Sequence, residues 1–346
     1  MKQSCQPIQT ALVGLNFGAG LADCQIFNGA GGEFIRIVAV CDRNLAKARK
    51  YAAVHEGIRI YGDLSDVLKD SSIEAVMLMI PPTGRSAAVR ECLAAGKHVL
   101  TTKPFDLDAD AALTVLHEAR ERKLVVHLNS PGPLPSCDLA QIRRWRKDFN
   151  LGKPVAGHWE TYAEYHETAD GSWFDSPEKC PVAPIFRIGI YGINEMVAVF
   201  GEPEDAEVIS GRIATGRPTP DNAQLLLRFA DGAIGSIYSA LCIGDGRLYP
   251  SAFTLHFEHG TIYKTQVRTA ADRDFTSVSM RLETLRGGRL HVESAELPAA
   301  ERSGSYQYEN FYRAVRNGPL PDEVSPETIV AGIKAIALMM RKDSAK

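Results

Sequence analysis

The sequence lacks both a strong excess of charge and a long hydrophobic run. Its 346 residues carry a formal net charge of −3 at pH 7. No dense basic run occurs, so the electrostatic footprint of a nucleic-acid-binding protein is absent. No apolar segment approaches the ~20 residues that a membrane-spanning helix needs. We therefore expect neither a nucleic-acid partner nor a membrane partner.

Paired cysteines are also missing. The seven cysteines are scattered, and none forms the C-x-x-C spacing of a zinc site or a redox motif. Several lie inside apolar patterns, where a free thiol packs as a small core residue. The acidic and histidine side chains between residues 158 and 170 lack the spacing of known zinc ligands. We predict no metal, no disulfide framework and a cytoplasmic, reducing location.

Short apolar runs alternate with helical patterns over the first ~130 residues, which is typical of a parallel α/β sheet. The expected strands are Ile8–Val13, Ile35–Cys41, Ile58–Tyr61, Ala75–Ile80, His98–Thr101 and Leu124–Leu128. After Asn129 a turn-rich segment intervenes, and alternating runs follow. Two of these runs flank Asp231–Gly232, a hairpin signal that predicts an antiparallel sheet. We predict a dinucleotide-binding Rossmann domain over 1–129 and an α+β domain over 130–346.

The first expected strand runs directly into a glycine-rich turn. Gly14 fits the first position of the G-x-G-x-x-G dinucleotide motif, and Asn16 and Ala19 stand at its second and third positions, with Phe17 and Gly18 between them. A strand, a glycine-rich turn and a helix start form a cradle for a pyrophosphate, because the helix N-terminus supplies N–H groups and a positive dipole. The alternative, a glycine-rich turn that binds nothing, stays open on this motif alone.

Asp42 and Arg43 follow the second expected strand. A carboxylate at this place accepts a hydrogen bond from the ribose 2′-hydroxyl and repels a 2′-phosphate, which favours NAD. Arg43 can pair with a 2′-phosphate instead, or lie in solvent at the helix start. The sequence therefore favours NAD and leaves NADP open.

Two further segments carry a family resemblance. Pro81, Pro82 and Thr83 follow the fourth expected strand, and Gly96–Phe105 (GKHVLTTKPF) spans the fifth. The chain resembles the Gfo/Idh/MocA oxidoreductases, whose hallmark is Glu-Lys-Pro after Gly-Lys-His-Val. Lys103-Pro104 matches this hallmark, and Thr102 replaces the glutamate. Further similarities lie at residues 188–194, 201–204 and 306–318, so the resemblance covers nearly the whole chain.

The resemblance implies a fold, a cofactor and a catalytic pair. The fold is a Rossmann domain followed by an α+β domain with a large, mostly antiparallel open sheet, which assembles homodimers or homotetramers, and the active site lies at the domain junction. Tyr191 indicates the tyrosine subgroup, to which glucose–fructose oxidoreductase and dihydrodiol dehydrogenase belong. Lys103 and Tyr191 are the expected catalytic residues. The expected NAD site consists of Gly14, Asn16, Phe17, Gly18, Ala19, Asp42, Arg43, Pro81, Pro82, Thr83, Thr102, Lys103, Pro104 and Asn129.

Four residues are candidates for substrate contact. Asn194 fits the family pattern for a bond to a substrate hydroxyl, Trp173 lies in a segment that reaches the active-site mouth in relatives, and Tyr162 lies on a polar strand face. Arg187 stands where the family usually has aspartate. Its guanidinium prefers a carboxylate or a phosphate. It either binds an anionic substrate group or pairs with a local acid such as Asp175 or Glu160.

These features predict an NAD(P)-dependent enzyme that oxidises or reduces a secondary alcohol or ketone of a sugar, polyol or cyclic diol. Two other functions remain compatible with the sequence. One is a redox-neutral glycosidase or lyase that keeps NAD bound through its cycle. The other is a non-catalytic sensor of sugars or nucleotides, although the presence of both Lys103 and Tyr191 argues against it.

Overall fold

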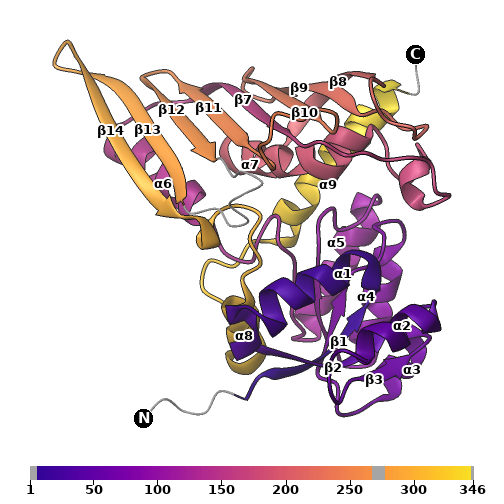
Figure 1. The fold of residues 1–346 in the computed structure, drawn as a ribbon. Coiled ribbons are helices and arrows are strands. Elements are labelled where there is room, and N and C mark those ends of the chain that lie inside the picture. Colours follow the sequence, from indigo (N-terminus) through magenta and orange to yellow (C-terminus); the bar gives the residue numbers. More distant parts are fainter. Residues whose placement is uncertain (1–5, 267–276, 344–346) are drawn as a thin grey trace. The chain divides into compact units, whose positions relative to one another are not determined.

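The computed structural model describes residues 6–266 and 277–343, and the chain forms two compact units (Figure 1). The first unit contains Met1–Leu134 and Tyr306–Pro326, and the second contains Pro135–Ser305 and Glu327–Lys346. The predicted boundary at residue 129 therefore lies a few residues early. The prediction also assigned Tyr306–Pro326 to the second domain, whereas this segment belongs to the first unit.

The first unit is built on a six-stranded parallel sheet with the order β3-β2-β1-β4-β5-β6, the Rossmann order. Its strands are β1 (Ile8–Val13), β2 (Ile35–Cys41), β3 (Arg59–Tyr61), β4 (Ala75–Leu78), β5 (His98–Thr101) and β6 (Val126–His127). The helices of this unit between the strands are α1 (Leu15–Ala22), α2 (Leu45–Ala52), α3 (Leu64–Lys69), α4 (Arg85–Ala94) and α5 (Ala109–Glu121). The predicted fold class of this half is confirmed.

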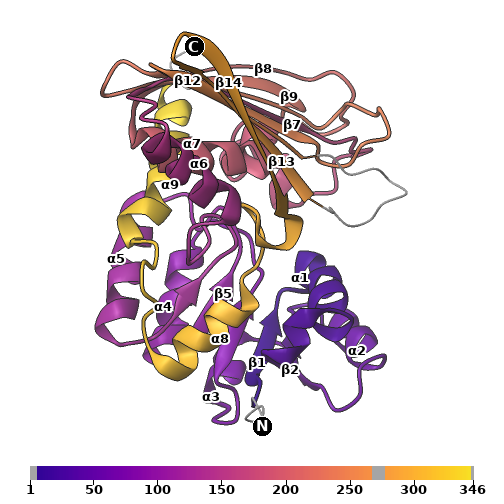
Figure 2. The same ribbon diagram turned by 90° about the vertical axis from the view of Figure 1, so that its left-hand side faces the viewer.

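Helix α8 (Tyr308–Asn317) brings the chain back to the first unit, as its position in Figure 2 illustrates. Phe311 is fully buried, and with Tyr308 it joins the core cluster that contains Ile8 and Ile35 of β1 and β2. The apolar side of an amphipathic helix needs a surface to cover, and here the Rossmann sheet provides it. This packing is the reason for the displaced domain boundary.

The second unit contains an eight-stranded sheet with the order β14-β13-β12-β11-β7-β10-β9-β8. Every neighbouring pair is antiparallel except β7 and β10, which are parallel. The predicted hairpin is present between β9 and β10, where Gly232 has a φ of 81°. The strands are β7 (Pro154–Tyr162), β8 (Pro203–Gly211), β9 (Asn222–Phe229), β10 (Ile234–Ala240), β11 (Ser251–Phe257), β12 (Gly260–Gln266), β13 (Ser277–Arg286) and β14 (Arg289–Pro298).

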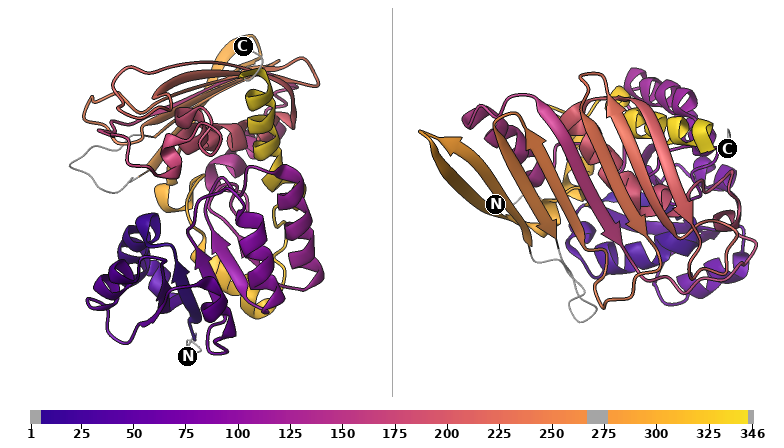
Figure 3. Two further views of the ribbon diagram at one scale, coloured as in Figure 1. Left: turned by 90° about the vertical axis from the view of Figure 1, so that its right-hand side faces the viewer. Right: turned by 90° about the horizontal axis from the view of Figure 1, so that it is seen from above.

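Helices cover one face of this sheet. Helix α6 (Cys137–Asp148) packs on β13 and β14, and α7 (Ile190–Phe200) packs on β7 and β10. Helix α9 (Pro326–Asp343) completes the helices of this unit. Among the described residues no helix covers the opposite face (Figure 3). Side chains therefore alternate along the strands: Leu225 is fully buried, whereas its neighbour Leu226 is 45% exposed.

Two further observations concern the described residues. No helix among them combines the length and apolar character that crossing a membrane requires. Six cysteines are free thiols, at positions 24, 41, 92, 137, 180 and 242, and Cys5 lies outside the described residues.

Candidate cofactor and active site

The turn between β1 and α1 approaches the end of β4 very closely. Gly14 has a φ of 90°, and a Cβ there would lie 2.6 Å from the carbonyl oxygen of Met79. A Cβ on Gly18 would lie 2.9 Å from a methyl carbon of Leu12. Glycine is thus required at position 14, and a side chain at position 18 would displace Leu12, so α1 starts directly against the sheet. Gly18 directly precedes Ala19, the residue at the third position of the motif.

Asp42 is held beside this turn. One carboxylate oxygen accepts the backbone N–H of Leu15 at 3.0 Å, and the other accepts that of Asn44 at 2.9 Å. A carboxylate offers about four acceptor positions, so lone pairs remain for a ribose hydroxyl. Lys47 of α2, which the sequence analysis did not single out, donates to the side-chain oxygen of Asn16 in the turn. Arg43 is exposed at the start of the same helix.

The segments after β4 and β5 are joined by a residue that sequence reasoning missed. Arg85 is only 1% exposed, and its guanidinium donates to the backbone carbonyls of Ile80, Thr102, Pro104 and Phe105. A planar guanidinium with several donors can serve acceptors on two segments at once. Burial lowers the pKa of Arg85 to about 10, so the side chain stays charged at neutral pH.

Asn129 fixes the backbone of Lys103 from the side of β6. It is 3% exposed, and its side-chain oxygen accepts the N–H of Lys103 at 3.1 Å and the hydroxyl of Thr102 at 3.3 Å. Arg85 holds the carbonyls on either side of Lys103. The backbone from which the Lys103 side chain leaves is therefore held on both sides.

All the predicted cofactor residues of this unit follow the carboxyl ends of parallel strands and share one edge of the sheet. Pro82 is buried, whereas Pro81 and Thr83 are exposed at that edge, and Phe17 is 56% exposed in the first turn of α1. Gly14 has no side chain to cap α1, so the first turn can offer N–H groups to an anion. This arrangement fits a dinucleotide.

In the second unit, residues 191, 192 and 194 of α7 make close contacts with three different elements. Tyr191 is partly buried, and a Cβ on Gly304 would lie 2.9 Å from its ring. A Cβ on Gly192 would lie 2.3 Å from the ring of Trp159, so α7 packs directly on β7. Asn194 is 9% exposed, and its side-chain oxygen lies against Gly332 of α9. Tyr191 and Asn194 are three residues apart and lie on neighbouring positions of the helix surface, where they contact Gly304 and Gly332 respectively.

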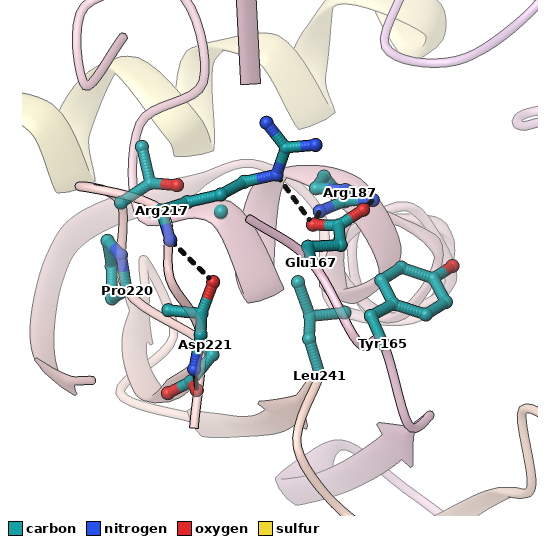
Figure 4. A pocket seen from close by; sticks show the side chains of 10 residues that line it. Tyr165, Glu167, Arg187, Arg217, Pro220, Asp221 and Leu241 are labelled. Atoms are coloured by element: carbon teal, nitrogen blue, oxygen red, sulfur yellow. Dashed lines mark hydrogen bonds and ion pairs between the residues drawn. The ribbon is translucent and has the colours of Figure 1, made fainter. Parts of the chain in front are cut away.

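Arg187 lies in the helical turn Ile185–Gly189 and pairs with Glu167 (Figure 4). Its two terminal nitrogens donate to the two carboxylate oxygens at 2.7 and 2.9 Å, and the guanidinium lies 4.3 Å from the ring centre of Phe174. Burial alone would raise the pKa of Glu167, but the hydrogen bonds from Arg187 and the second cation Arg217 lower it. The carboxylate that meets Arg187 is thus neither Asp175 nor Glu160.

Arg217 is the second cation of this cluster, and the sequence analysis did not identify it. It is 6% exposed and binds Glu167, Asp170 and Asp175 at 3.0, 2.9 and 2.7 Å. Among the residues that the structure describes, no group of three or more metal-ligating side chains occurs. Three acidic residues, Glu167, Asp170 and Asp175, instead form ion pairs with the two arginines.

Tyr162 and Trp173 occupy different surroundings. The Tyr162 hydroxyl donates to Asp245 at 2.9 Å, and Arg247 lies over its ring. Tyr162 also lies on the opposite strand face from Trp159, which packs against α7. Trp173 packs on Phe174 with ring centres 4.1 Å apart, next to the Arg187 cluster.

Two family models match the chain. Residues 8–130 match the model described as an oxidoreductase family with an NAD-binding Rossmann fold, and residues 139–263 match the model of the GFO/IDH/MocA C-terminal domain. The chain belongs to the Gfo/Idh/MocA family. Its first unit is therefore the family's NAD-binding domain, as the glycine-rich turn predicted.

Curated relatives of this Gfo/Idh/MocA chain include dehydrogenases. It is 29% identical to human trans-1,2-dihydrobenzene-1,2-diol dehydrogenase over 60% of this chain and 61% of that protein. It is 32% identical to inositol 2-dehydrogenase of Rhodococcus erythropolis over 44% of each chain. The matches span only about half to three fifths of the length of the first relatives.

Solved structures match nearly the whole chain. An enzyme of gentamicin A biosynthesis, solved with NAD, has a TM-score of 0.75 at 17% identity and covers 99% of this chain and 96% of that one. A 3-ketoreductase from Actinomadura kijaniata, solved with NADP and TDP-benzene, has a TM-score of 0.73 at 18% identity and covers 97% and 98%. At these identities the likeness shows the shared fold.

Proposed function

We propose that this protein is an NAD(P)-dependent dehydrogenase or reductase that acts on a secondary alcohol or ketone of a sugar, polyol or cyclic diol. The observation that carries the proposal is the set of cofactor segments at one sheet edge, where Arg85 and Asn129 fix the backbone of Lys103. The named dehydrogenase relatives support the substrate class.

Lys103 and Tyr191 are the catalytic residues in this proposal. When bound, NAD(P) supplies the hydride acceptor for oxidation or the hydride donor for reduction. In oxidation the deprotonated Tyr191 phenolate would take the hydroxyl proton of the alcohol as the carbon loses its hydride, and in reduction the neutral phenol would return that proton to the carbonyl oxygen. The Lys103 ammonium hydrogen-bonds the same hydroxyl and lowers the pKa of the phenol. The two residues belong to different units, so the pairing rests on their chemistry and on the family pattern.

The four candidate substrate residues fall into two groups. We retain Trp173 and Asn194 as proposed substrate contacts. The polar groups of Arg187 and Tyr162 already have charged partners, so we assign these two residues structural roles. A bidentate ion pair that is partly buried is costly to open for a ligand. This assignment favours a neutral substrate over an anionic one.

Reduction of NAD or NADP in the presence of three probes tests the proposal: trans-1,2-cyclohexanediol, myo-inositol and glucose. We expect turnover with at least one probe, and a loss of about 10²–10⁴-fold in kcat for Tyr191→Phe with unchanged NAD affinity, because only the phenolic oxygen is removed. A Tyr191→Phe protein with wild-type turnover would remove Tyr191 from the mechanism. Conversion of a glycoside without added cofactor would favour the redox-neutral alternative.

The same proposal includes the cofactor preference and the assembly. NAD is preferred because Asp42 is fixed at the end of β2 beside the turn. A homodimer or homotetramer forms through the uncovered face of the eight-stranded sheet, where Ile209 and Ile234 are 75% and 57% exposed. The free cysteines fit a cytoplasmic location. Light scattering during gel filtration measures the assembly, and an elution as monomer would contradict it.

A further inference from the structure

A buried ion cluster joins three elements of the second unit. Lys264 of β12 is 3% exposed, and its ammonium donates to Asp138 of α6 at 2.8 Å and to Glu195 of α7. Asp138 and Glu195 are themselves 1% and 4% exposed. Buried charges of this kind add little net stability, because desolvation offsets their attraction. The cluster does have a geometric effect, because the Lys264 ammonium fixes α6, α7 and β12 against one another.

The cluster also holds a turn. The second carboxylate oxygen of Asp138 accepts the backbone N–H of Ser303 at 3.1 Å. Gly304 follows with a φ of 88°, in the left-handed region that favours glycine. A Cβ on Gly304 would lie 2.9 and 3.1 Å from two carbon atoms of the Tyr191 ring. The turn that Asp138 holds is thus in direct contact with Tyr191.

Helix α7 closes the connection from the other side. Tyr191 and Glu195 are four residues apart, so they lie on the same side of the helix. Glu195 is held by Lys264, and the Tyr191 ring lies against Gly304. Helix α7, which carries the Tyr191 ring, and the turn that contacts this ring are therefore both connected to the Lys264 ammonium, through Glu195 and Asp138 respectively.

We propose that the Ser303–Gly304 turn is a positioning element for Tyr191, and that the Asp138–Lys264–Glu195 cluster fixes this turn relative to helix α7. The inference rests on the proposed function, because it concerns the residue that moves the proton. A general base must lie within hydrogen-bond reach of its proton, and a displacement of about 1 Å can cost about 10²-fold in rate. A fixed turn packed against the ring limits such displacement.

Gly304→Ala tests the contact. The new methyl group enters the space of the Tyr191 ring, so we expect kcat to fall about 10–100-fold for the best of the three probes, with unchanged NAD affinity. The matched control is Gly232→Ala in the β9–β10 hairpin. Gly232 has a φ of 81°, and nothing lies within 4 Å of its built Cβ. This control introduces a similar backbone strain without the clash, and it should leave kcat unchanged.

Asp138 variants test the anchor. Asp138→Asn keeps an acceptor oxygen for the Ser303 N–H, whereas Asp138→Ala removes it. Both variants lose the negative charge and should lower the melting temperature. Only Asp138→Ala removes the hydrogen bond to the turn, so it should lose about tenfold more kcat than Asp138→Asn. Equal kcat in the two variants would show that Asp138 acts on overall stability and not through the turn.

A readout without substrate separates this inference from the proposed function. Nitration of Tyr191 by tetranitromethane, followed by mass spectrometry, reports how exposed the ring is. Gly304→Ala should change its rate at least threefold, and Gly232→Ala should not. If Tyr191→Phe turns over normally while Gly304→Ala alters nitration, the proposed function fails and the contact stands. If Gly304→Ala changes neither nitration nor turnover, the positioning element is refuted.

Discussion

Replacing Arg85 with methionine should loosen the cofactor edge of the first unit. Methionine has a similar length and no donors, so the change removes every hydrogen bond that joins the segment after β4 to the segment after β5 through this side chain. Lys103 lies between two of the carbonyls that Arg85 holds. We therefore expect the Arg85→Met protein to lose both stability and affinity for NAD.

Two opposing terms set the magnitude. Burial lowers the pKa of Arg85 from 12.5 to about 10, so the charged form costs about 3 kcal/mol that methionine does not incur. Against this, four carbonyls lose their donor, and each costs about 1–3 kcal/mol where it stays buried and unpaired. The loss outweighs the gain, and we expect the free energy of unfolding to fall by about 1–9 kcal/mol, toward the lower end if water reaches some of the carbonyls.

Urea unfolding followed by circular dichroism measures the stability, and calorimetry with NAD measures the affinity. Arg85→Lys keeps the charge, but one ammonium cannot serve four acceptors on two segments, so it should resemble Arg85→Met. Arg90→Met is the control on the same helix, because Arg90 is half-exposed and pairs with Glu118 at 2.9 Å. An Arg85→Lys protein with wild-type stability and affinity would refute the reasoning from the planar guanidinium.

The remaining predictions concern Asp42 and Arg187. Asp42→Asn keeps an acceptor for the N–H of Leu15 but loses the charge that repels a 2′-phosphate. Calorimetry should therefore show weakened NAD binding and equal or tighter NADP binding. Equal losses of affinity for the two dinucleotides would contradict the assignment. Arg187→Met should lower the free energy of unfolding by about 1–3 kcal/mol and leave the ranking of substrates unchanged, whereas selective loss on acidic sugars would restore a substrate role. The folded-state pKa of Glu167 is lowered, so its ion pair stabilises above the unfolded pKa of about 4.3 and is lost as pH falls through the folded value. The difference in melting temperature between Arg187→Met and wild type should therefore shrink from pH 7 to pH 3.

The sheet of the first unit was predictable because its central strands β1, β4 and β5 are buried on both faces. The expected runs Ile8–Val13, Ile35–Cys41 and His98–Thr101 have the bounds of β1, β2 and β5. Such runs are nearly continuous in apolar residues and end at turn residues. The expected run Leu124–Leu128 was longer than β6, because edge residues beyond Val126–His127 have the same composition but no partner strand in register.

The packing of segments that are far apart in the sequence could not be predicted from the sequence. The apolar residues of Tyr308–Arg316 recur with helical spacing, and the structure has helix α8 there. Periodicity shows that a helix has an apolar side but not which sheet that side covers. Phe311 packs in the Rossmann core although residues 135–305 of the other unit separate it from the rest of that core in the sequence. The domain boundary therefore required the structure.

The burial of Arg85 is indicated by its position in the sequence of α4. It lies four and seven positions before Val89 and Cys92, and all three are buried on one side of α4. An arginine in such a row must find acceptors inside the protein, because a buried charge without partners is strongly unfavourable. The row itself does not reveal the acceptors, since the carbonyls come from two strand ends that are adjacent only in the folded sheet.

Arg187 is a second arginine that needs acceptors inside the protein, and its acceptor is a carboxylate. A cation at a position where the family usually has an acid needs a new partner, and the sequence offered several carboxylates without ranking them. The structure joins Arg187 to Glu167, while Arg217 binds Glu167 and also pairs with Asp175. The acidic segment thus contains the counter-charges for both arginines. The charge of Arg187 is therefore compensated within the second unit, which supports the proposal of a neutral substrate.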